Sequence, residues 1–161
     1  MMRILIVSDS HGDKTGLRWI AQQCWQRWPH LDACLHCGDG ARDFERLSAF
    51  FLAHDPGIAL WGVRGNCDFA AQVPEERVLS LGGSRLYLTH GHLLRVKQGL
   101  TLLDEEAERQ ECGIALYGHT HIQAMDTRRT LMINPGAACD GRYAVMELEA
   151  GRPRLHLETC A

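Results

Sequence analysis

Short apolar runs alternate with amphipathic segments in the first part of the chain. The runs at residues 3–8, 33–37 and 58–63 are compact and largely apolar, as expected of strands buried on both faces. Between them, apolar residues recur with a helical period over residues 17–28 and again over residues 44–51. This alternation of strands and helices predicts parallel neighbouring strands joined by right-handed crossovers.

The pattern changes after about residue 76, where short alternating runs separated by turn residues predominate. Residues 78–81 and 85–89 flank Gly82-Gly83 and predict a hairpin, and a further helix is expected over residues 98–110. Five more strands are predicted at residues 114–117, 123–126, 130–133, 143–148 and 154–158. About ten strands and three helices indicate an α/β fold in which two packed sheets are flanked by helices. We expect a single domain spanning residues 1–161.

Composition fits a globular domain and limits the partners to be expected. The chain is 45% hydrophobic and 23% charged, with a formal net charge of −3. No overall positive field is present to hold a long nucleic acid, so any affinity for phosphate must be local. The first apolar run holds only the four residues 4–7 before polar residues follow, far short of a signal-peptide core or a membrane span. We therefore expect a cytoplasmic protein that does not contact membranes.

The cysteines point to a reducing compartment. There are seven, an odd number scattered over the chain, which is a poor match to a secreted disulfide framework. Cys34 and Cys37 form a C-x-x-C motif, but no second pair follows at zinc-ribbon spacing. We interpret these two cysteines as small core residues rather than metal ligands.

Polar residues with metal-binding chemistry follow five of the predicted strands, each beside a glycine. In open α/β sheets, ligands bind beyond the carboxyl ends of the strands, because the loops diverge there while the sheet holds their bases. Glycine allows tight turns and close backbone approach at such ends. The residues concerned are Asp9 with His11, Asp39, Asn66 with Asp68, His90 with His92, and His119 with His121.

These residue types indicate divalent metal ions. Carboxylates, an amide and several imidazoles suit borderline ions, with manganese as our first choice and iron, nickel, zinc or cobalt as alternatives, rather than calcium. The seven candidate ligands, more than one tetrahedral set needs, are Asp9, His11, Asp39, Asn66, His90, His119 and His121. Two ions about 3.5–4 Å apart could share one carboxylate, for which Asp39 is the candidate. Two divalent ions and two carboxylates leave a site charge of about +2, which suits an anionic phosphate ester.

The ordered motifs resemble those of the calcineurin-like metallophosphoesterase superfamily, above all its small single-domain phosphodiesterases of bacteria and archaea. The motifs are D-x-H at 9–11, G-D at 38–39, G-N-x-D at 65–68, H-G-H at 90–92 and G-H-x-H at 118–121. The resemblance implies a four-layer α/β/β/α sandwich. It also implies two overlapping ligand sets, the first formed by Asp9, His11, Asp39 and His121 and the second by Asp39, Asn66, His90 and His119.

One position departs from the pattern of the superfamily's protein phosphatases. There, a histidine that protonates the leaving group follows the motif asparagine, whereas here Cys67 follows Asn66. A thiol is a poor general acid, so we expect better turnover of esters whose leaving groups need little protonation. The G-N-C-D form is similar to that of the small phosphodiesterases. The choice between diesters and monoesters stays open.

Two further residues complete the catalytic set that we predict, which is Asp39, Asn66, Asp68 and His92. The carboxylate of Asp68 could orient a ligand imidazole, or Asp68 could be an ordinary turn residue. His92 is expected behind the ligands or against the substrate. For His36, which precedes the Gly38-Asp39 turn, we favour a place outside the site.

The sequence thus predicts a dinuclear phosphodiesterase that hydrolyses small phosphodiesters by direct attack of a metal-bridging hydroxide. The alternatives are a phosphomonoesterase, or a catalytically weak interaction scaffold of the same fold, since a retromer subunit of eukaryotes resembles this fold. A nuclease acting on long nucleic acid ranks lower, because no basic track is present. The oligomeric state is left open, homo-oligomers included.

Overall fold

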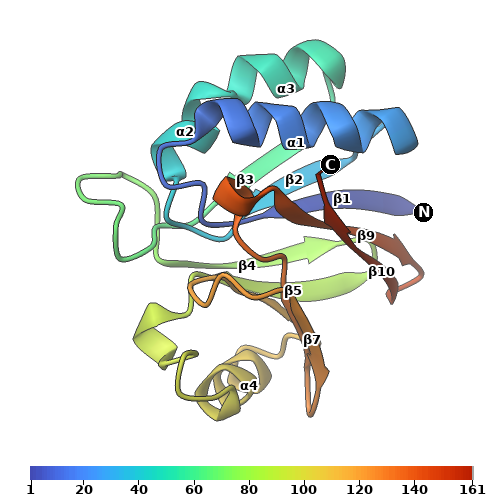
Figure 1. The fold of residues 1–161 in the computed structure, drawn as a ribbon. Coiled ribbons are helices and arrows are strands. Elements are labelled where there is room, and N and C mark those ends of the chain that lie inside the picture. Colours follow the sequence, from blue (N-terminus) through green and yellow to red (C-terminus); the bar gives the residue numbers. More distant parts are fainter. Residues whose placement is uncertain (161) are drawn as a thin grey trace.

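Two five-stranded sheets lie face to face in the computed structural model, which describes residues 1–160 (Figure 1). In the first sheet, β1, β2 and β3 run parallel. The strand β9 pairs antiparallel with β1, and β10 pairs antiparallel with β9. Its strands, in spatial order, are β10 (Arg152–Thr159), β9 (Arg142–Glu149), β1 (Met2–Val7), β2 (Ala33–His36) and β3 (Ala59–Gly62).

The second sheet is also mixed. The strands β5, β6 and β8 run parallel, and the two edge strands pair antiparallel with their neighbours. Its strands, in spatial order, are β4 (Glu76–Leu81), β5 (Ser84–Thr89), β6 (Ile114–Leu116), β8 (Leu131–Asn134) and β7 (Ala124–Thr127). The predicted pair of mixed sheets is confirmed.

Helices cover the two outer faces of this sandwich (Figure 1). The first sheet carries α1 (Lys14–Arg27), α2 (Ala41–Arg46) and α3 (Ser48–His54), and the second carries α4 (Thr101–Arg109). Two short 3₁₀ turns are η1 (His92–Leu94) and η2 (Ala138–Asp140). The predicted four-layer α/β/β/α order is therefore confirmed. Within residues 1–160, no helix is both long and apolar enough to cross a bilayer.

The alternation of side chains along β1 explains why this strand is apolar over residues 4–7. Ile4 and Ile6 belong to the core cluster between the sheets, together with Leu88 of β5. Leu5 and Val7 point the other way, into the cluster beneath α1. Both faces of the strand are buried over residues 4–7, so each of these four positions takes an apolar residue. The strand that precedes Asp9 is thereby held from both sides.

Two local predictions differ from the structure. The single helix expected over residues 44–51 is two short helices, α2 and α3, which meet at Leu47. Leu47 donates its N–H to the Phe44 carbonyl at 3.1 Å, a tighter turn that interrupts the α-helical pattern. The expected helix over residues 98–110 begins later, at Thr101. Cys34 and Cys37 are buried free thiols within the core, as predicted.

Candidate metal centre

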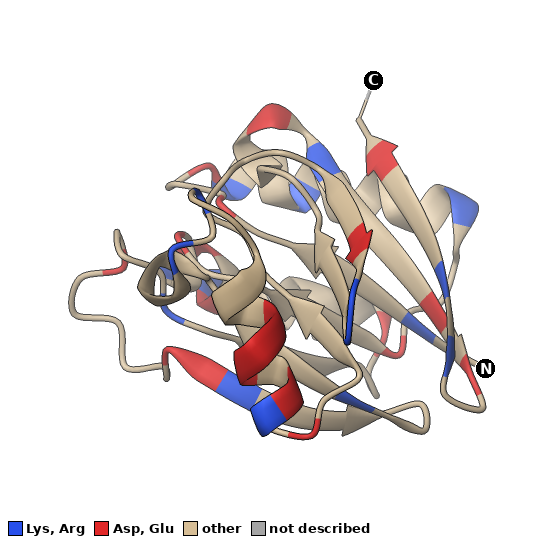
Figure 2. Ribbon diagram, turned by 90° about the horizontal axis from the view of Figure 1, so that it is seen from below, with Lys and Arg blue, Asp and Glu red and all other residues tan. Residues whose placement is uncertain are grey.

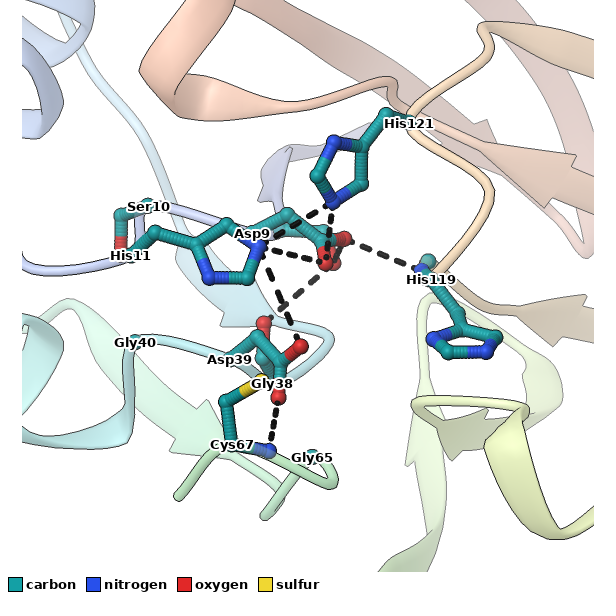
Figure 3. Close-up of polar contacts among 12 residues, drawn as sticks. Asp9, Ser10, His11, Gly38, Asp39, Gly40, Gly65, Cys67, His119 and His121 are labelled. Carbon is teal, nitrogen blue, oxygen red and sulfur yellow. Dashed lines mark hydrogen bonds and ion pairs between the residues drawn. The ribbon is translucent and has the colours of Figure 1, made fainter.

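Six of the seven predicted ligands come together at one edge of the sandwich, beyond the carboxyl ends of strands from both sheets. Figure 3 shows five of them, Asp9, His11, Asp39, His119 and His121. The loops after β1 and β2 are joined by backbone hydrogen bonds, from Asp9 N–H to Gly38 O and from His11 N–H to Asp39 O, both 2.9 Å long. Because the parallel strands end at this same edge, loops distant in sequence meet there. The second sheet contributes His90 after β5, and His119 and His121 after β6.

Three of these residues form a compact first group. The His11 and His121 Nε2 atoms are 3.1 Å apart, and both face Asp9 Oδ1, at 3.4 Å and 3.2 Å respectively (Figure 3). Two imidazoles that turn nitrogens toward each other and toward one carboxylate oxygen offer a ready-made ligand set. Ligand atoms about 2.0–2.2 Å from one cation lie roughly 3.0–3.5 Å from one another. The observed spacings fit a divalent ion.

A second group surrounds Asp39. One ligand atom each of Asp39, His90 and His119 lie within 4.8 Å of one another. His90 Nε2 is 3.4 Å from Asp39 Oδ2 and 3.1 Å from Asp9 Oδ1. Asp39 Oδ2 also lies 3.9 Å from His11 Nε2 in the first group. Both carboxylates therefore face imidazoles of both groups, and the donor set can accommodate two ions.

Asn66 lies at the rim of this arrangement. The residue is exposed, and its amide contacts Cys67 Sγ at 3.6 Å. None of the contacts described above involves its side chain. The ligand role that the family resemblance implies for Asn66 stays a prediction.

Asp9 is buried, and its hydrogen bonds keep it ionised. Ser8 Oγ and the His119 backbone N–H donate to Asp9 Oδ2, at 2.5 Å and 3.0 Å. Burial raises the pKa of Asp9, but the hydrogen bond and charge of His90, with these two donors, bring it down to about 2. The carboxylate is thus ready to bind a cation at neutral pH. Sequence reasoning missed Ser8, which carries no motif signal apart from its place before Asp9.

Asp68 makes backbone contacts rather than the contact with a ligand imidazole that was one of its two possible roles. Its two oxygens accept backbone N–H groups of Asp39, Gly40, Ala41 and Gly65, at 2.7, 2.9, 3.1 and 2.8 Å. A single carboxylate thereby ties the loop after β2 to the loop after β3. The partner that Asp68 fixes is the backbone of Asp39 rather than a histidine ring.

Cys67 also supports Asp39 through its backbone. Its N–H donates to Asp39 Oδ1 at 2.8 Å (Figure 3). Cys67 is exposed, but neighbouring atoms still remove part of the water around its thiol. This desolvation, together with the nearby charge of Asp39, raises the pKa of the thiol above its usual value. The side chain is therefore a neutral thiol at physiological pH, although its Sγ lies near His11 and Asp39.

His92 and His36 lie behind the candidate ligands. His92 Nδ1 is 3.1 Å from His90 Nδ1, so one of the two nitrogens donates and the other accepts. His36 is fully buried and accepts the Gly38 N–H at Nδ1, at 3.0 Å. Its Nε2–H must then donate to Ser10 Oγ, which in turn donates to Asp43 at 2.8 Å. His36 is thus outside the ligand set, as we favoured, yet it connects the two loops that carry Asp9 and Asp39.

A second support missed by sequence reasoning is Asn134. Its buried amide donates to Gly118 O at 3.1 Å and to Thr120 Oγ1 at 2.9 Å, which holds the loop of His119 and His121. Asn134 begins an N-P-G sequence at 134–136, but no local pattern indicates that Gly118 and Thr120 are its partners.

The backbone is strained where the candidate ligands are. Positive φ angles are uncommon for residues other than glycine and collect at functional sites. Nine such residues occur among residues 1–160, and five of them are candidate ligands. They are Asp9 at 54°, His11 at 47°, Asp39 at 57°, His119 at 71° and His121 at 62°. The conformation that aims these side chains is held against local preference, which marks the edge as a functional site.

Two glycines allow the loops to approach the carboxylates. A Cβ on Gly65 would overlap Asp39 Oδ1, and a Cβ on Gly118 would overlap Ser8 Oγ and Asp9 Oδ2. These positions have room only for a hydrogen, so the G-N and G-H motifs reflect packing against the carboxylates.

Comparison with known proteins agrees with this geometry. The calcineurin-like phosphoesterase superfamily domain matches residues 2–151. The chain belongs to that superfamily. It is 36% identical to the probable metallophosphoesterase YsnB of Bacillus subtilis (strain 168), over 92% of this chain and 85% of that one. It is 31% identical to the phosphodiesterase YfcE of Escherichia coli (strain K12), over 85% of this chain and 79% of that one.

A solved structure shows the same fold at similar identity. The crystal structure of a predicted phosphoesterase from Streptococcus pneumoniae TIGR4 is 31% identical, with a TM-score of 0.75, and the match covers 98% of this chain and 89% of that one. The calcineurin-like phosphoesterases are metal-dependent hydrolases, and this chain's Asp and His groups could bind metal ions. The family predicted from the motifs is confirmed.

Proposed function

We propose that this calcineurin-like phosphoesterase is a phosphodiesterase that uses two divalent metal ions, manganese first among them, to hydrolyse small phosphodiesters. The observation that carries the proposal is the pair of overlapping ligand groups centred on Asp9 and Asp39. The ligand atoms of Asp9, His11 and His121 are spaced 3.1–3.4 Å apart, and those of Asp39, His90 and His119 lie within 4.8 Å of one another. The phosphodiesterase name of the E. coli relative supports the choice of diesters.

The chain's own residues prepare the site for an anionic ester. Asp9, His11 and His121 would hold one ion, and His90 and His119 the other, with Asp39 between them and Asn66 added from the rim. Bound ions would activate a water molecule and stabilise the charge on the phosphate oxygens. Asp68 and Cys67 N–H orient Asp39, while His92 supports His90. Asp39 and His90 are thus held in place by neighbouring residues.

The candidate acid next to Asn66 favours substrates with good leaving groups. Cys67 is a neutral thiol whose raised pKa makes it a weak proton donor. Esters of acidic alcohols such as phenols leave without protonation and would be hydrolysed fastest. A diester of this kind carries a single negative charge, so the site needs little positive charge to bind it.

The distribution of charge favours a small substrate over a long nucleic acid. Lysine and arginine are scattered among acidic residues on the face seen in Figure 2, where α4 carries an acidic stretch. A polyanion would need a continuous basic track. The partners that we propose are therefore small phosphate esters.

The test is metal-dependent hydrolysis of bis(4-nitrophenyl) phosphate by the purified chain after treatment with EDTA and reloading with Mn²⁺, Fe²⁺, Ni²⁺, Zn²⁺ or Co²⁺. We expect activity only with added metal. Asp39→Asn and His90→Ala should lower kcat/KM by at least about a hundredfold, because each removes a donor facing both candidate groups. Metal content measured after dialysis should fall in the same variants.

Matched controls come from exposed residues far from the ligands. Asp126→Asn on β7 and His54→Ala on α3 make the same chemical changes and should keep wild-type activity. If the wild type is inactive with every metal, or if Asp39→Asn retains full activity, the phosphodiesterase proposal is wrong.

The remaining alternatives differ in what the same assay shows. A phosphomonoesterase would hydrolyse 4-nitrophenyl phosphate faster than the diester under identical conditions. A scaffold would bind metal without turnover of either ester. The intact carboxylate and imidazole set, with five candidate ligands in strained backbone, favours catalysis, and turnover of either ester separates an enzyme from a scaffold that only binds metal.

A further inference from the structure

A cavity of about 450 Å³ opens directly beside the candidate metal centre. Its lining includes His11, Asp39 and residues of the helix α2. The volume lies within the usual range for small-molecule sites, about 300–1,000 Å³. A phosphate bound between the metal groups would therefore leave space beside it for the rest of the substrate.

Two arginines line this cavity from α2. Arg42 and Arg46 are four residues apart, so they lie on the same face of the helix. The arginine ion pairs formed within residues 1–160 involve Arg3, Arg27, Arg64, Arg109 and Arg129. Neither Arg42 nor Arg46 is paired with a carboxylate of the described chain. Their guanidinium groups remain available for an anion.

The carboxylates of the same cavity are occupied by hydrogen bonds. Asp43 Oδ2 accepts from Ser10 Oγ and from the Gly12 N–H, each at 2.8 Å. Asp68 accepts the four backbone N–H groups described above. Both carboxylates are thus already hydrogen-bonded by the loops that carry the candidate ligands, and neither forms an ion pair with Arg42 or Arg46, although Asp43 lies between these arginines on α2.

An exposed aromatic ring completes the cavity. Phe69 is 83% exposed although it is a large apolar residue, and it lines the same space as Arg42 and Arg46. The hydrophobic clusters of the core do not include it. Aromatic rings in such positions stack on planar groups of a ligand, and nucleobases are stacked in this way.

We infer that the cavity beside His11 is a subsite for the retained part of the substrate, which carries a planar ring and a second anionic group. Arg42 and Arg46 bind the anion and Phe69 stacks on the ring, as in a nucleotide that bears a further phosphate. This inference rests on the proposed phosphodiesterase function, and it names the class of substrate on which that activity acts.

Three chromogenic esters that all release 4-nitrophenol test the subsite. Methyl 4-nitrophenyl phosphate has neither ring nor second anion on the retained side. Thymidine 5′-(4-nitrophenyl phosphate) adds the ring, and its 3′-phosphorylated form adds the second anion. We expect kcat/KM to rise along this series for the wild type. The reaction and leaving group stay the same, so the differences report on the retained part alone.

Two variants separate the contributions. The double variant Arg42→Gln with Arg46→Gln should lower the preference for the 3′-phosphorylated ester over its parent nucleoside ester by about tenfold. Phe69→Ala should lower the preference for the nucleoside ester over the methyl ester by about fivefold. Each single arginine variant should show part of the effect. These substitutions lie on exposed positions, so folding should be preserved, and urea unfolding checks that it is.

Arg154→Gln on β10 is the matched control, since it removes the same charge from an exposed position in another cavity, beside Met1. It should leave both preferences unchanged. Equal turnover of the three esters by the wild type, or preferences unaffected by the arginine and Phe69 variants, would overturn the subsite while leaving the phosphodiesterase proposal standing. Failure of the wild type to hydrolyse any of them would instead contradict the proposed function itself.

Discussion

Individual side chains in the candidate centre are held in place by hydrogen bonds from backbone N–H groups and hydroxyls. Asp9 accepts from Ser8 and His119, and Asp39 accepts from Cys67. Donors of this kind favour the ionised carboxylate and restrict its rotation. The two acidic residues are therefore oriented by the protein before any ion binds, so an ion meets a formed site rather than a flexible one.

His36 provides a prediction about pH at the same scale. Burial lowers the pKa of this histidine to about 4, although the nearby aspartates oppose the shift. In the unfolded chain the imidazole takes up a proton near pH 6.5, whereas in the folded chain it stays neutral until the pH approaches 4. Stability present above pH 6.5 is therefore lost as the pH falls toward 4. Between pH 7 and pH 5 the free energy of unfolding should drop by about 2 kcal/mol through this residue.

The measurement is urea unfolding of the wild type and His36→Gln at several pH values, with EDTA present. Glutamine can accept from Gly38 and donate to Ser10 but does not titrate. The variant should show a shallower decline over this pH range than the wild type. Parallel curves for the two proteins would contradict the assigned role of His36.

The sequence predicted the candidate ligands more fully than their supports. His90 and Asp39 are visible because each follows an apolar run beside a glycine. Ser8, Asn134 and the backbone contacts of Asp68 depend on which loops meet, and that is decided by strand order. Asp39 and Asp68 are 29 positions apart, and no local sequence pattern predicts the hydrogen bond between them.

Whole elements decide how closely the loops approach. Glycine occupies turn positions 65 and 118 because little space remains there beside the carboxylates of Asp39 and Asp9. Strand predictions were accurate since buried strands need apolar residues on both faces. The division between α2 and α3 was missed because the apolar period continues across Leu47, where only the hydrogen-bond pattern changes.

Gly65 tests the role of close approach at the level of the loop after β3. Gly65→Ala places a methyl group against Asp39 Oδ1, so the carboxylate or the loop must move. We expect a destabilisation of about 1–3 kcal/mol and a loss of metal affinity of at least tenfold. Urea unfolding and metal titration measure the two effects.

Gly57→Ala is the comparison, because a Cβ at Gly57 meets no atom within 4 Å. It should change stability by less than about 1 kcal/mol and leave metal affinity intact. If Gly65→Ala behaves like Gly57→Ala, the loop has more room than the structure indicates.

Over the whole molecule, the candidate centre joins the two sheets. Asp9, His11 and Asp39 follow strands of one sheet, whereas His90 and His121 follow strands of the other. Bound ions would therefore link the halves of the sandwich across the edge of their shared core. Unfolding must separate these halves and dismantle the site at the same time.

This arrangement predicts stabilisation by metal. Ions that bind only the folded chain at about a hundred times their Kd raise its free energy of unfolding by about 2.7 kcal/mol per site. The midpoint of thermal unfolding should rise with added Mn²⁺ and return to its starting value with EDTA. His90→Ala should show a smaller rise, while His54→Ala should match the wild type. A midpoint that does not respond to any of the five metals would contradict the prediction.

Five candidate ligands have left-handed backbone, and this affects which substitutions the chain could accept there during evolution. Each of these positions would be relaxed by glycine, which adopts positive φ without steric strain, or by asparagine, which tolerates it. Glycine supplies no ligand atom, so the metal binding that we propose would require aspartate and histidine there in spite of the strain. In a descendant that no longer needed ions, glycine at positions 11, 119 and 121 would relieve the strain. At positions 9 and 39 it would also leave Ser8 Oγ and the N–H groups of His119 and Cys67 without their carboxylate acceptors.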